Sequence, residues 1–179
     1  MKGNPITARM IPSIFTLANL LFGFLALILV NEEEHTLAAA LILVAVLMDS
    51  MDGKVARRLS VSSDFGKELD SLSDVVSFGV APAILTYQAI LYPLQPGYIR
   101  YIMLSIAAIF ALCGAIRLAR FNMLNITTHF VGVPITFAGG LLALLVFFRT
   151  MLPWYSYPIS MVFLAFLMVS TFKVTKLGK

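Results

Sequence analysis

The chain has 179 residues, of which 60% are hydrophobic and only 12% are charged, and its formal net charge is +4. A soluble domain has roughly 45–50% apolar residues, so this composition excludes an ordinary soluble protein and indicates an integral membrane protein. The apolar residues extend along nearly the whole chain. We therefore expect residues 1–179 to form a single membrane domain, surrounded by lipid and without a nucleic-acid partner.

Six apolar runs follow one another along the chain, at residues 11–30, 37–48, 75–91, 99–118, 131–148 and 154–172. The first run and the last three have about the 20 residues that a helix needs to cross a bilayer. The second and third look too short, because Asp49 ends one and Asp74 precedes the other. We expect both helices to continue through the acidic stretch between them. The sequence therefore predicts an all-α integral membrane protein with six transmembrane helices.

Several residues within these runs bear on helix packing. Asn19 is polar within the first apolar run, so it is expected to face the interior of the bundle. Pro82 lies inside the third predicted helix and is expected to kink it. Ala107, Ala111 and Ala115 recur at four-residue spacing in the fourth, which suits the close approach of a neighbouring helix.

The basic residues predict the orientation. If the N-terminus is cytoplasmic, 11 of the 13 Lys and Arg residues lie in cytoplasmic segments, and only Arg100 and Arg149 lie outside. Cytoplasmic loops of membrane proteins are enriched in Lys and Arg. We therefore expect a protein of the cell membrane with both termini cytoplasmic, and the acidic stretch faces the same side.

This acidic stretch, residues 48–76, holds six of the nine acidic side chains of the chain. Asp49 lies about 18 Å along its helix from residue 37, and the hydrocarbon core is about 30 Å thick. Asp74 lies about 25 Å from the other end of its helix at residue 91. Both carboxylates are therefore expected just inside the cytoplasmic edge of the membrane.

The spacing of four acids places them on two helix faces. Asp49 and Asp52 are three residues apart, and Gly66, Asp70 and Asp74 follow at four-residue intervals. In an antiparallel hairpin these carboxylates converge, and they are tolerated there only if some are protonated or if cations neutralise them. Divalent cations bound by carboxylate oxygens are the simplest answer. Two metal ions held by four acids are suited to phosphoryl chemistry.

The neighbouring residues fit a ligand pocket beside the acids. Gly53 and Ala56 are small enough to let a ligand approach the helix, and Arg57, one turn from Gly53, can contact a phosphate. Asp64 and Glu68 fall outside the facial pattern. We interpret these two as charges of a cytoplasmic loop.

The motif Asp-x-x-Asp-Gly-x-x-Ala-Arg, eight residues, then Gly-x-x-x-Asp-x-x-x-Asp occupies residues 49–74. It resembles the signature of the CDP-alcohol phosphotransferases, and the six-helix architecture also fits that family. The resemblance implies that an alcohol hydroxyl attacks the lipid-bearing phosphate of a CDP-linked donor and that CMP leaves.

By the same resemblance, Asp49, Asp52, Asp70 and Asp74 bind Mg²⁺ or Mn²⁺, with two ions expected, and Asp74 is the candidate general base. Metal ions offset charge on the pyrophosphate while a carboxylate accepts the hydroxyl proton. The residues implied to contact the CDP-lipid are Asn19, Gly53, Ala56, Arg57 and Gly66. For Asn19, an interhelical hydrogen bond is an equal alternative. The resemblance also implies a homodimer.

Two further stretches, LCGAIRLARFN at residues 112–122 and FVGVPITFAGG at residues 130–140, resemble the phosphatidylserine synthase branch of the family, as does IPSIFTLANLLFG near the N-terminus. The second stretch departs from the more usual Gly-Leu-Pro-x-Pro-Ala pattern, with Val133 and Thr136 in place of Leu and Pro. This branch implies a CDP-diacylglycerol-type lipid and L-serine as substrates and phosphatidylserine and CMP as products.

Arg117 and Arg120 follow an apolar run at i and i+3. One reading is that one of them holds the serine carboxylate or a phosphate, with Asn122 at the serine amino group; the other is positive-inside anchoring. Three alternatives to serine transfer remain open. They are a family member with another acceptor, such as glycerol phosphate or inositol phosphate, a cation transporter that uses the acids as its ion site, and a purely structural membrane subunit.

Overall fold

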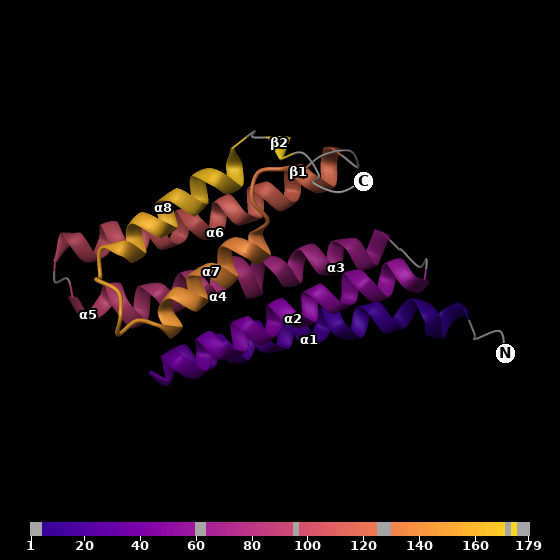
Figure 1. The fold of residues 1–179 in the computed structure, drawn as a ribbon, viewed down its shortest axis with the longest axis horizontal. Helices are drawn as coiled ribbons and strands as arrows, with labels where there is room; N and C mark the ends of the chain where they lie inside the picture. The colour runs from indigo at the N-terminus through magenta and orange to yellow at the C-terminus, as the bar shows by residue number, and fades with distance from the viewer. Residues whose placement is uncertain (1–4, 60–63, 95–96, 125–129, 171–172, 175–179) are drawn as a thin grey trace.

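The computed structural model describes residues 5–59, 64–94, 97–124, 130–170 and 173–174, and the side chains of residues 14–51, 65–93, 97–123 and 132–170. The helical segments are α1 (Pro5–Asn31), α2 (His35–Leu59), α3 (Asp64–Asp74), η1 (Val75–Val80), α4 (Ala81–Thr86), η2 (Tyr87–Leu91), α5 (Tyr92–Leu94), α6 (Tyr98–Leu124), α7 (Ile135–Phe147) and α8 (Ser156–Val169). Segments α3 to α5 follow one another without a break and form one long rod. The described chain therefore has six helical rods (Figure 1).

The six rods run roughly along one direction, and the chain reverses between consecutive rods (Figure 1). The start of α1, the reversal from α2 to α3 and the end of α6 all lie at the same end of the bundle. At that end, β1 (Phe130–Val131) pairs antiparallel with β2 (Lys173–Val174). This pairing joins the segment before α7 to the segment after α8.

The expected continuation of the second and third helices through the acidic stretch is confirmed. Helix α2 extends from His35 to Leu59, and the next rod begins at Asp64. Pro82 lies in the first turn of α4, directly after a π-helical segment, η1, and the kink expected at this proline stays a prediction. A π-helical segment widens the helix, and such segments are frequent at functional sites.

The predicted bounds of the fifth and sixth helices are wrong. Helix α7 begins at Ile135 rather than at residue 131, because Pro134 forms its N-cap with an extended backbone (φ −57°, ψ 140°). Gly132 has φ of +74°, which favours glycine and is incompatible with a helix. Helix α8 ends at Val169, and Ser170 is extended at its C-cap. The apolar sequence around each helix is therefore longer than the helix itself.

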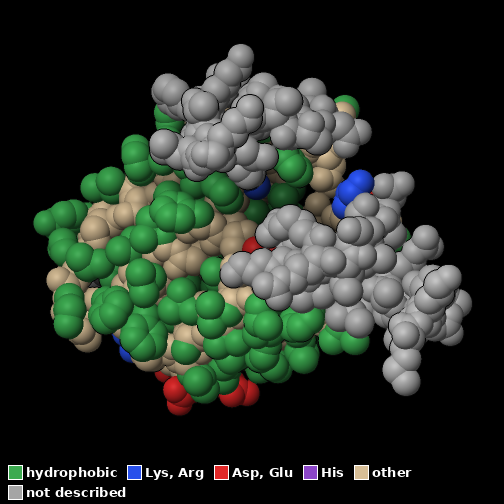
Figure 2. Space-filling view, turned by 45° about the vertical axis from the view of Figure 1, so that its right-hand side comes forward, with side chains coloured by type: hydrophobic (Ala, Val, Ile, Leu, Met, Phe, Trp, Pro, Cys, Tyr) green, Lys and Arg blue, Asp and Glu red, His purple; other side chains and the backbone are tan. Residues whose placement is uncertain are grey.

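Among the described residues, three helices are long and apolar enough to cross a membrane: Ile14–Asn31, Phe65–Leu91 and Tyr98–Met123. Shorter apolar helices cover His35–Met51, Ile135–Phe147 and Ser156–Val169. Large hydrophobic side chains are exposed along α1, α6 and α8, for example Phe24, Ile109 and Phe163. Hydrophobic side chains also cover most of the described surface of the face in Figure 2. An extensive apolar exterior is typical of a protein surrounded by lipid.

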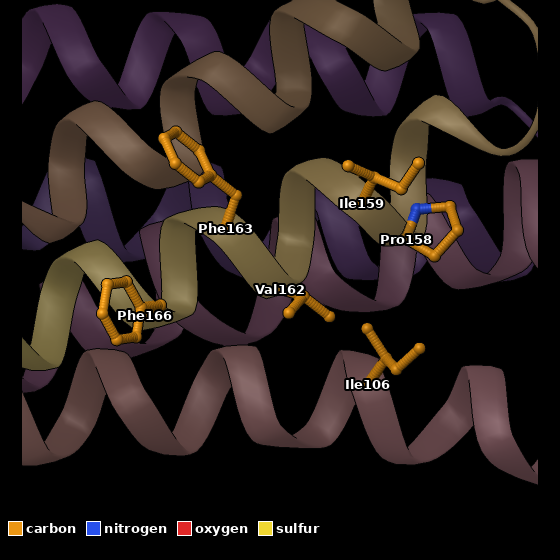
Figure 3. A pocket seen from close by; sticks show the side chains of 6 residues that line it. All are labelled: Ile106, Pro158, Ile159, Val162, Phe163 and Phe166. Carbon is orange, nitrogen blue, oxygen red and sulfur yellow. The ribbon is translucent and has the colours of Figure 1, made fainter.

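An apolar groove of about 550 Å³ lies between α6 and α8 (Figure 3). Its lining residues are Ile106, Pro158, Ile159, Val162, Phe163 and Phe166. All of them are apolar, so the groove belongs to the same lipid-compatible exterior.

The rod from α3 to α5 lies at the centre of the bundle. Of the three long apolar helices it is the most buried: 67% of its span is buried, against 28% for the first and 22% for the third. Small residues allow its neighbours to approach its backbone closely. A Cβ added at Gly139 of α7 would lie 2.6 Å from the Phe78 Cα of η1, and one added at Gly79 would lie 3.9 Å from the Ala111 Cα of α6. The contact at Ala111 agrees with the close packing expected from the alanine spacing.

A methyl group at Gly139 is expected to destabilise the bundle, because it would overlap backbone atoms of Phe78 that cannot move independently. Overpacking of this kind costs about 1–3 kcal/mol. We predict that Gly139→Ala lowers the midpoint of thermal unfolding in detergent by several degrees. Gly140→Ala is the matched control, because its Cβ would meet only the terminal Val46 Cγ2 at 3.1 Å. Equal midpoints for the two variants would contradict the packing described here.

Candidate active and metal site

Three acidic side chains from two consecutive rods meet near the end of the bundle where α2 turns into α3. Asp49 of α2 and Asp70 and Asp74 of α3 each offer one carboxylate oxygen, and these oxygens all lie within 4.8 Å of one another. Asp49 and Asp70 are half-buried, and Asp74 is only 7% exposed. Like charges this close and this shielded from water require compensation.

The donor set fits a hard divalent cation. Calcium binds carboxylate oxygens at about 2.3–2.6 Å and magnesium at about 2.0–2.1 Å, so two oxygens on one ion are at most about 5 Å apart for calcium and about 4 Å apart for magnesium. The oxygens of Asp49, Asp70 and Asp74 lie within 4.8 Å of one another. A calcium-sized ion therefore fits these separations, and side-chain rotation alone would bring the oxygens to the shorter spacing of a magnesium-sized ion.

Asn19 of α1 supports the most buried of the three acids. Its Nδ2 donates a hydrogen bond to Asp74 Oδ1 at 3.3 Å, and Asn19 itself is fully buried. Its Oδ1 is buried and has no hydrogen-bond partner among the described residues. The interhelical hydrogen bond expected as one reading of Asn19 is therefore present, and a carbonyl oxygen remains for a donor group on a ligand.

The position of Asn19 is fixed by close contact between α1 and η1. Ser77 Oγ donates a hydrogen bond to the Asn19 backbone oxygen at 3.0 Å. One turn further along α1, a Cβ at Gly23 would lie 2.8 Å from the Ser77 Cα, so only glycine allows this approach. Ser77 follows Asp74 by three residues and is uncharged, so no feature of the sequence predicted its role.

Arg117 of α6 brings a positive charge to the same place. It is half-buried and interacts electrostatically with Asp74. Its Nε is buried and has no hydrogen-bond partner among the described residues. Arg117 therefore offers a shielded guanidinium donor beside the acid cluster.

The other two residues predicted to bind serine form hydrogen bonds within the protein. Arg120 Nη1 donates to the Val169 carbonyl at 3.4 Å, near the end of α8. Asn122 Nδ2 donates to Ser71 Oγ of α3 at 3.0 Å. The structure thus brings Arg117 to the acids, whereas Arg120 contacts α8 and Asn122 joins α6 to α3.

Thr136, in the first turn of α7, also contacts the cluster. Its hydroxyl hydrogen-bonds the Asp49 carboxylate. In the sequence, Thr136 stands out only as a departure from the usual proline, and that departure is the signal that a polar group occupies this position. Helices α1, α2, α6 and α7 and the rod that begins with α3 therefore all contribute to one site.

The remaining predicted positions lie in α2 and α3. Asp52, Gly53, Ala56 and Arg57 belong to the last turns of α2, and their side chains lie outside the described residues. Gly66 is half-buried in α3, one turn before Asp70. Glu68 lies in α3 rather than in a loop, and its side chain is exposed, away from the acid cluster. Asp64 is the first residue of α3 rather than a loop residue, and its side chain is outside the described part.

Comparison with known proteins agrees with this geometry. The CDP-alcohol phosphatidyltransferase family matches residues 9–172. The chain is 36% identical over 149 residues to a CDP-diacylglycerol–serine O-phosphatidyltransferase of Helicobacter pylori. The matched region covers 82% of this chain and 60% of that protein. It is 48% identical over 127 residues to the protein of that name from Methanocaldococcus jannaschii, covering 71% of this chain and 55% of the relative.

A third relative, an archaetidylserine synthase of Methanothermobacter thermautotrophicus, is 42% identical over 133 residues, covering 72% of this chain and 54% of the relative. The matches thus span little more than half the length of these relatives. The family match, in contrast, includes nearly the whole chain and every residue of the acid cluster. The chain belongs to the CDP-alcohol phosphatidyltransferase family.

Proposed function

We propose that the protein transfers the phosphatidyl group of a CDP-activated lipid of the diacylglycerol type to the hydroxyl of L-serine, giving phosphatidylserine and CMP. The observation that carries this proposal is the shielded guanidinium of Arg117 beside Asp49, Asp70 and Asp74. Serine brings a carboxylate to the reaction, and arginine is the side chain best suited to bind one, since its planar guanidinium matches the geometry of a carboxylate. The names of the three relatives all include serine.

The proposed metal site is the acid cluster of Asp49, Asp70 and Asp74 together with Asp52. Its bound Mg²⁺ or Mn²⁺, with two ions expected, would neutralise charge on the pyrophosphate of the donor. Gly53, Ala56, Arg57 and Gly66 are the proposed contacts of the CDP-lipid, together with Asn19. The unpartnered Asn19 Oδ1 supports its inclusion, because it can accept a hydrogen bond from a ligand.

Asp74 is the proposed general base. It accepts the proton of the serine hydroxyl while the serine oxygen forms a bond to the lipid-bearing phosphorus, and the bond from that phosphorus to the CMP oxygen breaks. Asn19 hydrogen-bonds one Asp74 oxygen and so limits the rotation of the carboxyl group. Arg117 binds the serine carboxylate. Arg120 and Asn122 remain predicted serine contacts that would have to release their present partners.

We further propose that all six rods cross the cell membrane, with the acid cluster at its cytoplasmic side. The distribution of basic residues supports this orientation. Arg100, near the start of α6, lies beside the other end of the central rod. There its Nε donates to the Tyr87 hydroxyl at 3.2 Å, and its guanidinium lies 3.9 Å from the centre of the Tyr92 ring. Tyrosine side chains are enriched at membrane–water interfaces. A homodimer, expected from the family resemblance, stays a prediction.

Family membership favours group transfer over cation transport and over a purely structural role. The nearest competing function is transfer to a different alcohol, such as glycerol phosphate or inositol phosphate. These acceptors carry a phosphate, which requires more positive charge than Arg117 alone supplies. Serine is the acceptor that matches the charge of the described site.

The acceptor can be tested directly with the full chain purified in detergent. CDP-diacylglycerol and a CDP-linked ether lipid are each supplied with Mn²⁺ and one alcohol at a time, and CMP release is measured. We expect release with L-serine and only background release with glycerol phosphate, inositol phosphate or no acceptor. Release with another alcohol but not with serine would refute the proposed acceptor. Ion flux without any CMP release would point to a transporter instead.

The acid cluster is tested by removing single charges. We predict that Asp70→Asn and Asp74→Asn each lower turnover about 100-fold or more, because one loses a metal ligand and the other also loses the base. Glu68→Gln is the matched control, since this exposed acid lies on the same helix outside the cluster. Wild-type turnover of Asp74→Asn at saturating Mn²⁺ would remove Asp74 from the mechanism.

Arg117 and Arg120 provide a matched pair for serine binding. Loss of one partner of a buried charge pair costs about 2 kcal/mol or more, which is about 30-fold. Arg117→Gln is therefore expected to raise the KM for serine by at least that factor, with little change in the KM for the CDP-lipid. Arg120→Gln is expected to change the serine KM by about 5-fold at most. The reverse order would assign the serine carboxylate to Arg120.

A further inference from the structure

The hydrogen bond between the Thr136 hydroxyl and the Asp49 carboxylate joins α7 to the acid cluster. The sequence stretch around Thr136 resembles a pattern that has proline at this position. Proline has no hydroxyl, so this contact is a feature of chains that carry a hydroxyl residue there. The contact is not part of the signature motif, because Thr136 lies 62 residues beyond its last aspartate.

The packing of α7 against α2 supports this contact independently. One turn after Thr136, a Cβ at Gly140 would meet Val46 Cγ2 at 3.1 Å. Val46 precedes Asp49 by three residues, so Val46 and Asp49 lie on one face of α2. Thr136 and Gly140 likewise share one face of α7, and the two faces meet in antiparallel order. The Thr136–Asp49 contact is therefore the continuation of a close helix interface.

The first turns of α7 are also held against the rod that carries Asp70 and Asp74. Gly139 is so close to the Phe78 backbone of η1 that an added Cβ would overlap it. Ile135, at the start of the helix, is almost fully buried and would contact a Cβ at Gly114 of α6. Thr136 therefore stands on a helix end fixed by neighbours on both sides.

We propose that Thr136 is a positioning residue that holds the Asp49 carboxylate in the orientation in which it meets Asp70 and Asp74 at a divalent cation. An ionised carboxylate has two oxygens and about four acceptor positions, so one hydrogen bond leaves room for a metal ion. Hydroxyl partners of metal-ligating carboxylates orient the ligand, and their loss typically costs about 10–100-fold in metal affinity or activity. The proposal rests on the proposed metal-dependent transfer only for its effect on turnover.

The test compares Thr136→Val, which keeps the shape of the side chain without its hydroxyl, with Thr136→Ser, which keeps the hydroxyl. Mn²⁺ binding to the full chain in detergent is measured by the electron paramagnetic resonance signal of free Mn²⁺, without any substrate. We expect Thr136→Val to weaken Mn²⁺ binding about 10-fold or more, and Thr136→Ser to bind nearly as wild type. The Mn²⁺ concentration for half-maximal CMP release should shift by a similar factor.

Thr86→Val is the matched control. Thr86 is buried whereas Thr136 is half-buried, and the Thr86 hydroxyl donates to the Pro82 carbonyl at 2.7 Å within its own helix. Its substitution is expected to leave Mn²⁺ binding unchanged. If Thr136→Val does not fold, Thr136→Ala gives the same comparison with a smaller side chain.

The outcomes separate this inference from the proposed function. Equal Mn²⁺ binding by wild type, Thr136→Val and Thr136→Ser would overturn the role of Thr136, even if serine-dependent turnover is present. Weaker binding by Thr136→Val alone would support it, even if serine proves not to be the acceptor. Equally weakened binding by Thr136→Ser and Thr136→Val would assign the effect to packing and refute the role of the hydroxyl.

Discussion

The structure depends on the placement of three carboxylates among apolar helices. Asp49, Asp70 and Asp74 offer oxygens within 4.8 Å of one another, and ionised groups at this separation and burial are tolerated only when other groups offset their charge. Each source of compensation comes from a different helix. Asn19 of α1 donates to Asp74, Thr136 of α7 donates to Asp49, and Arg117 of α6 supplies a positive charge. The site therefore exists only when the whole bundle is assembled.

The segment η1, which starts directly after Asp74, explains how one rod serves so many neighbours. Three consecutive buried residues of η1 reach three helices: Ser77 contacts α1, Phe78 contacts α7, and Gly79 lies beside both α6 and α7. Gly23 of α1, Gly139 of α7 and Gly79 itself allow these close approaches. A π-helical turn has a wider backbone and a different side-chain spacing from an α-helix. The same local geometry thus holds the acidic end of the rod against three helices.

The charges of the side chains and the spacing of the three acids together limit the reactions that the site can support. The acids fit a divalent cation, which is suited to a pyrophosphate donor, and Arg117 is suited to a small acceptor with a carboxylate. Family membership supports the donor, whereas the position of Arg117 supports the acceptor. Arg120, three residues further along α6, contacts the end of α8 instead. Two arginines of similar sequence context thus have different surroundings.

The sequence by itself determined the membrane class, the six helical rods, the continuation of α2 and α3 through the acids and the helix faces on which Asp49, Asp70 and Asp74 lie, because hydropathy and helical spacing are local properties. It did not determine where α7 begins. The apolar run starts before the helix, because Gly132 and Pro134 have non-helical backbone and the helix starts only after them. It also did not separate Arg117 from Arg120 or find the contacts of Thr136 and Ser77. Those depend on which helix packs against which, and residues far apart in the chain decide that only in the tertiary structure.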